Sequence, residues 1–136
     1  MHTPFRAIAV ATALAAAAPA LAHHSFAAEY DASQPITLMG TVTRIELINP
    51  HAWLYIEVRD AQGHAAQWNI EMGAPNSLIR RGINKSSVAV GAQVTVDGYR
   101  AKDGTNTVNG TTIKLSDGRS LFSGSNGAPG APQTAQ

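Results

Sequence analysis

A two-residue alternation of apolar and polar side chains constrains the fold of this chain more than any other feature. The apolar members of its clearest stretch are Ala52, Leu54, Ile56 and Val58. The positions between them, starting one residue earlier, are His51, Trp53, Tyr55 and Glu57. Because successive side chains of a strand point to opposite faces, this pattern predicts a half-buried β-strand with its aliphatic side in the core.

Further strands are predicted on both sides of this one. A long β-prone stretch covers residues 36–48, and its apolar phase slips near Thr43 and Arg44, which indicates a bulge or bend. After a hairpin loop centred on Gly63, a third strand alternates around Trp68 and Ile70. Later strands are predicted near residues 93–99, 107–115 and 120–122.

A short helix is predicted between the third and fourth strands, over residues 74–82. Pro75 lies near its first turn, arginines occupy its last turn, and Gly82 lies just beyond its end. Three strands, a helix and two more strands is the order of the OB-fold. The expected fold class is all-β with one short helix, as an OB-fold-like five-stranded Greek-key barrel. An open antiparallel sandwich, which uses the same strands, is the alternative.

The first 22 residues have the organisation of a cleaved secretory signal peptide. Arg6 lies in a short polar start, an apolar run follows over residues 7–18, and the small residues Ala20 and Ala22 precede the expected cut. The apolar run is too short and too rich in alanine to span a bilayer, and no later segment is apolar enough to do so. We therefore expect a periplasmic or secreted protein without a membrane span.

Cleavage would leave a single domain. Residues 23–35 form a lead-in segment, residues 36–122 the OB-like domain, and residues 123–136 a tail expected to be disordered because it is rich in Gly, Ala and Pro and carries no charge. Loss of Arg6 leaves nine basic against nine acidic residues, which argues against a nucleic-acid partner. The absence of cysteine excludes disulfides and thiolate chemistry.

Four separated segments resemble one bacterial family. They are His23–Asp31 (HHSFAAEYD), Asn49–Trp53 (NPHAW), Gly73–Asn76 (GAPN) and Gly98–Gly104 (GYRAKDG). On these segments, which occur in order and extend over nearly all of the mature chain, the protein resembles the uncharacterised exported bacterial domain-of-unknown-function family 6152. The resemblance implies export and brings no activity, substrate or catalytic residue.

The histidines at the expected mature amino terminus are the sharpest chemical lead. His23 would offer an α-amine of pKa ~7.7 to 8.0 and an imidazole of pKa ~6.5, which together form a chelate. His24 would add a third nitrogen, and His51 a fourth if the lead-in folds back over the barrel. Nitrogen donors favour Cu(II), so copper is the expected ion. The arrangement resembles the histidine brace of copper monooxygenases and the amino-terminal site of periplasmic copper carriers.

Less specific interpretations of the same histidines stay open. A solvated terminus would bind only adventitious metal, and His51, which follows Asn49 and Pro50 at a strand start, would cap a turn through its ring nitrogens. His64, in the hairpin, is expected to be exposed.

The polar side of the second and third strands is the other candidate site. Its expected ligand-binding residues are Trp53, Tyr55, Glu57 and Asn69. OB-folds commonly hold oligosaccharides or peptides on these strands, so the face predicts a module that binds a peptide, glycan or partner protein. Coverage of the rings by the lead-in or the helix is the alternative.

Catalytic motifs are not found in the sequence. It contains no cysteine nucleophile, nucleophile elbow, phosphate loop or committed carboxylate pair, so we expect a binding protein rather than an enzyme. Copper is its preferred ligand, recognition through the aromatic face is the alternative, and a copper monooxygenase comes third.

Overall fold

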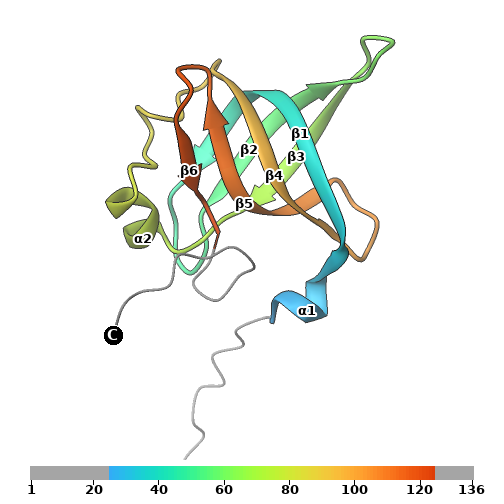
Figure 1. The fold of residues 1–136 in the computed structure, drawn as a ribbon, viewed down its shortest axis with the longest axis horizontal. Helices are drawn as coiled ribbons and strands as arrows, with labels where there is room; N and C mark the ends of the chain where they lie inside the picture. The colour runs from blue at the N-terminus through green and yellow to red at the C-terminus, as the bar shows by residue number, and fades with distance from the viewer. Residues whose placement is uncertain (1–24, 125–136) are drawn as a thin grey trace, which may run out of the picture.

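The computed structural model describes residues 25–124, which are mostly β-strand (Figure 1). The elements in chain order are α1 (Phe26–Glu29), β1 (Tyr30–Glu46), β2 (Trp53–Arg59), β3 (Ala65–Glu71), α2 (Pro75–Arg80), β4 (Gln93–Ala101), β5 (Thr107–Leu115) and β6 (Ser120–Phe122). The expected signal peptide, His23, His24 and residues 125–136 lie outside the described range. Among the helices that are described, neither α1 nor α2 has the length and apolar character needed to cross a membrane.

The six strands form one sheet whose hydrogen bonding closes into a ring. The strand order is β3-β2-β1-β4-β5-β6, and an additional pairing joins β3 to β5. That pairing is parallel, with Ile70 opposite Val108, whereas the other pairs are antiparallel. The prediction of a mostly β chain with a short helix after the third strand is confirmed, and the short helix α1 is an addition to it.

β1 is long enough to serve as a partner for two strands. Its first part pairs with β4, where Leu38 lies opposite Val96, and its second part pairs with β2, where Ile45 lies opposite Leu54. The register with β2 shifts between Val42 and Arg44, so the predicted slip at this point is confirmed. A bend there lets one strand contribute to both sides of the ring.

β1 begins at Tyr30, six positions before the expected start at Ile36. Tyr30 lies opposite Ala101 and Pro35 opposite Tyr99, with a register shift between these two pairs. Residues 30–35 show no clear alternation, but the two ends of this segment pair with β4. The second half of the expected lead-in is therefore strand.

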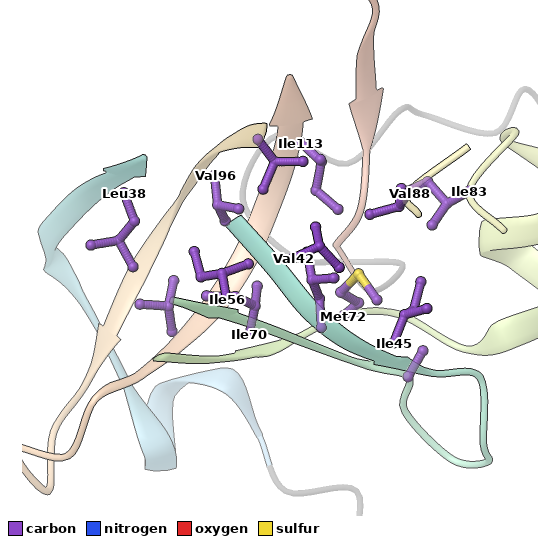
Figure 2. Close-up of a cluster of buried hydrophobic side chains, with 14 of the residues drawn as sticks. Leu38, Val42, Ile45, Ile56, Ile70, Met72, Ile83, Val88, Val96 and Ile113 are labelled. Carbon is purple, nitrogen blue, oxygen red and sulfur yellow. The ribbon is translucent and has the colours of Figure 1, made fainter. Parts of the chain in front are cut away.

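The apolar sides of the strands meet in one core inside the ring. Figure 2 shows side chains from β1 facing those of β2, β3, β4 and β5, with Met72, Ile83 and Val88 continuing the cluster towards α2. The six residues expected in the core are all buried, namely Leu54, Ile56, Trp68, Ile70, Val94 and Val96. The face assignment of the strands is confirmed.

The helix α2 covers one side of the core. Pro75 occupies its first turn, Leu78 is fully buried, and Gly82 follows with a positive φ of 89° that L-residues rarely adopt. Ser123 and Gly124, which the sequence placed in the tail, are also buried. The Ser123 carbonyl accepts a hydrogen bond from the Gly73 amide, and the Ser123 amide donates one to the Thr111 carbonyl. The packed chain therefore extends to the end of the described residues.

β4 and β5 approach each other closely where Gly98 lies opposite Gly110. A Cβ atom on Gly98 would lie 2.2 Å from the carbonyl oxygen of Asn109, so only glycine fits there. The next pair along is Tyr99 and Asn109, which belongs to the face carrying the candidate site.

Candidate functional site

The carboxylate of Glu71 is the centre of the candidate site. Glu71 is the last residue of β3 and alternates with the core residue Ile70, so its side chain belongs to the outer face of the sheet. It is nevertheless only 7% exposed. A carboxylate so removed from water requires hydrogen-bond partners, and two side chains distant in sequence provide them.

The first partner is Tyr30, whose hydroxyl donates a hydrogen bond to Oε2 of Glu71. Tyr30 is buried, and its burial, followed by its bond to Glu71, raises the pKa of its hydroxyl far above the usual value. The phenol therefore stays protonated and acts as a donor.

α1 covers Tyr30 and connects this cluster to the lead-in. The ring of Phe26 stacks on Tyr30 at a centroid distance of 5.8 Å and meets Tyr99 edge-on at 5.4 Å. Lys102 donates hydrogen bonds to Ala27 and Glu29 from the turn after β4, beside which α1 lies (Figure 1). The described part of the lead-in thus packs against the end of the sheet.

The second partner is His51, whose Nδ1 hydrogen-bonds to Oε1 of Glu71. Backbone hydrogen bonds hold the neighbouring Ala52 in both directions, to the carbonyl of Gly73 and from the amide of Met72. The His51 side chain is 29% exposed, and its Nε2 makes no hydrogen bond within residues 25–124. His51 is therefore anchored to a carboxylate on β3 through one nitrogen and keeps the other available.

A row of outer-face residues surrounds Glu71. In the strand register, Trp53 lies opposite Glu71 on β2, and Asn109 lies opposite it on β5. Asn109 is only 5% exposed, and its Oδ1 has no hydrogen-bond partner in the described part of the chain. The outer face is thus buried and polar at this end of the sheet.

The predicted aromatic face is already occupied by contacts within the chain. The hydroxyl of Tyr55 donates to Oε2 of Glu46 over 3.0 Å, and the guanidinium of Arg44 lies 3.9 Å from the Tyr55 ring centroid. Burial and the bond to Glu46 raise the pKa of Tyr55. Glu57 accepts a hydrogen bond of 2.6 Å from Arg59. These polar groups are satisfied by their neighbours on β1 and β2.

Trp53 and Asn69 are half-buried members of the same face. Asn69 lies opposite Tyr55, while Trp53 lies opposite Glu71. Of the predicted ligand-binding residues, Trp53 lies directly opposite Glu71, and Asn69 lies two positions before it on β3.

Sequence reasoning missed Glu71 and Tyr30 as site residues. Glu71 shares the polar phase of β3 with Asn69, and Tyr30 belongs to the lead-in, so neither stands out locally. Their contacts join positions 41 and 20 residues apart, which no local pattern encodes. The available signal was that Tyr30 and His51 both lie within segments that carry the family resemblance.

The described residues do not by themselves make up a metal centre. Within residues 25–124 no group of three or more His, Cys, Asp or Glu side chains is arranged to hold a metal ion. His51 supplies one imidazole there, and the other predicted donors, His23 and His24, lie outside that range. His64, on the hairpin, is exposed as expected and contacts Asp60.

Comparison with known proteins identifies a family. The model of a family of unknown function, DUF6152, matches residues 11–111, a stretch that includes Tyr30, His51, Glu71 and Asn109. No curated protein and no solved structure matches the chain.

Proposed function

The chain belongs to this DUF6152 family of unknown function, and we propose that it is a small exported, periplasmic binding protein that holds a copper ion between His51 and the mature amino terminus. His23 contributes its α-amine and imidazole, and His24 or His51 completes the site. The protein acts by binding.

The fold proposed for this function is an OB-like five-stranded Greek-key barrel. The ring order β1-β2-β3-β5-β4, with α2 between β3 and β4, supports it. The described part of the lead-in packs near Glu71, because Phe26 stacks on Tyr30 and Tyr30 donates a hydrogen bond to Glu71.

The hydrogen bond between Glu71 and His51 is the observation that carries the copper proposal. Histidines that bind metals almost always donate their other ring N–H to a carboxylate, a carbonyl or water, and this fixes the orientation of the ring. His51 has that partner at Nδ1 and is partly exposed. An imidazole held in this way needs no further ordering to bind a metal.

Covalent geometry allows the mature amino terminus to approach His51. Phe26 packs on Tyr99, and Tyr99 is two strands away from Glu71, a distance of about 10 Å at the usual strand spacing. His23 is three residues before Phe26, and three residues extend to about 10 Å. The two lengths are similar, so a chelate formed by His23 has the reach to include His51.

The nitrogen donors of the proposed site favour copper. An α-amine and two or three imidazoles form a donor set that favours Cu(II) over the other common divalent metals. These donors must lose their protons to bind, so affinity falls as the pH drops.

The test is a Cu(II) titration of tag-free protein exported through its own signal. Intact mass should first show that the mature chain starts at His23. The native form is then compared with a form carrying one extra residue before His23, with His51→Ala, and with His64→Ala as the matched control.

The extended form should lose most of its affinity because its new peptide bond removes the free amine of His23. His51→Ala should also bind more weakly, and His64→Ala should bind like the native form. Circular dichroism confirms that each variant is folded. Equal binding by the extended and native forms, or a mature chain that starts elsewhere, would reject the site.

Recognition of a peptide, glycan or partner protein through the aromatic face is the second proposal. The position of Trp53 opposite Glu71 favours it, because this ring borders the same end of the sheet. A Trp53→Ala variant that binds copper normally but loses capture of oligosaccharides or peptides, while Trp68→Phe retains it, would favour this function over copper.

A further inference from the structure

We infer that Glu71 holds His51 in the tautomer that carries its proton on Nδ1, so that Nε2 is the nitrogen that binds the metal. Glu71 and Tyr30 are then positioning residues. The metal part of this inference rests on the proposed function, whereas the tautomer is a property of the metal-free protein.

The hydrogen-bond pattern around Glu71 determines the tautomer. An ionised carboxylate only accepts hydrogen bonds. The Tyr30 hydroxyl donates to Oε2, and Oε1 is in contact with Nδ1 of His51. Nδ1 must therefore be the donor in this second bond. A neutral imidazole with its proton on Nδ1 has its lone pair on Nε2.

The burial of the three side chains points to the same division of roles. Glu71 and Tyr30 are 7% and 4% exposed, whereas the side chain of His51 is 29% exposed. Both oxygens of Glu71 are engaged by protein donors, so the carboxylate positions the ligand and does not coordinate the ion itself. His51 is the member of the cluster that reaches solvent and an incoming ligand.

Tyr30 connects this arrangement to the lead-in. It occupies the second oxygen of Glu71 and also stacks on Phe26 of α1. Without its hydroxyl, Oε2 would be buried without a donor, and the carboxylate could rotate away from His51. Tyr30 therefore makes the orientation of His51 depend on packing of the segment that follows His23.

The test combines a tautomer measurement with a metal titration. Long-range proton–nitrogen correlation spectra of ¹⁵N-labelled mature protein, free of metal, should show His51 protonated on Nδ1. Glu71→Gln should weaken or reverse this preference, because an amide can also donate to Nδ1. Asp97→Asn on β4 is the matched control, since Asp97 contacts Thr37 and Lys114, and it should leave the His51 signals unchanged.

Metal binding is then followed with Cu(II) and with Zn²⁺, a diamagnetic probe that allows the nitrogen signals to be read. Zn²⁺ should shift the Nε2 resonance of His51 while Nδ1 stays protonated. Glu71→Gln should lower Cu(II) affinity by about 10- to 100-fold, the usual effect of losing such an outer partner. Tyr30→Phe should lower it less, and His64→Ala not at all.

The outcomes separate the two proposals. A metal-free His51 protonated on Nε2 would overturn the inference, even if copper binds to the terminus. Protonation on Nδ1 with no change in Nε2 on adding metal would reject His51 as a ligand and with it the metal part of the inference. An Nδ1-protonated ring whose Nε2 responds to metal, with reduced affinity in Glu71→Gln, supports the inference in full.

Discussion

The Tyr30 hydroxyl donates a hydrogen bond to the Glu71 carboxylate, which lies 41 positions later in the chain. This contact joins the first residue of β1 to the last residue of β3. Because the same carboxylate contacts His51, it links the start of the domain to this histidine. The candidate site is therefore a product of the tertiary structure.

Replacing Tyr30 with phenylalanine should destabilise the protein more than the same change at Tyr55. Tyr30→Phe leaves a buried carboxylate oxygen without its donor, and hydrogen bonds to charged groups are worth about 1.5 to 3 kcal/mol. The Tyr55 hydroxyl bonds to Glu46 in a more exposed position, so Tyr55→Phe should cost less than about 1 kcal/mol. Urea denaturation measures both free energies of unfolding, and equal losses would contradict a special role for Glu71.

Acid should destabilise the protein partly through Asp60. The backbone amide of His64, its side chain and the amides of Gln62 and Gly63 lower the pKa of Asp60 in the folded state. Folding is therefore favoured above the unfolded pKa of about 3.9, and this contribution is lost as the pH falls through the lower folded value. Thermal unfolding should show a lower Tm at about pH 3 than at about pH 5.

The Asp60→Asn variant separates this contribution from those of other carboxylates. Asparagine keeps an acceptor oxygen for the loop amides but cannot titrate. The difference in Tm between the two pH values should therefore shrink in the variant. An unchanged difference would show that Asp60 does not contribute, leaving the exposed Asp31, Asp103 and Asp117, whose pKa values are also lowered by hydrogen bonds.

Truncating a core side chain of β2 should lower the free energy of unfolding much more than truncating an exposed side chain of β1. Leu54 is fully buried, so Leu54→Ala should lower the free energy of unfolding by about 2 to 5 kcal/mol. Met39 is 73% exposed, and Met39→Ala should change it by no more than about 0.5 kcal/mol. Chemical denaturation of the two variants checks the face assignment, which would be wrong by one residue if the costs were reversed.

Local patterns in the sequence predicted most of the secondary structure. The alternation around Leu54 and Trp68 predicted β2, β3 and their buried sides, because strand geometry repeats every two residues. Pro75 and Gly82 indicated the two ends of the helix α2. Proline has a fixed φ that suits the first turn of a helix, and glycine readily adopts the positive φ found just after its end. The start of β1 at Tyr30 was not predicted. That segment is a strand because it pairs with β4, and its side chains show no alternating pattern that would reveal this.

The candidate site also combines residues that the sequence predicted with residues that only the tertiary structure revealed. His51 could be identified from the sequence as a candidate ligand because an imidazole can bind a metal whatever the fold around it. His23 and His24 remain predictions of the sequence alone. The roles of Glu71 and Tyr30 were decided only by the tertiary structure. Burial and hydrogen bonding depend on which distant segments meet in the fold. Here the ring of strands and the lead-in bury the Glu71 carboxylate, and Tyr30 and His51 provide its hydrogen-bond partners.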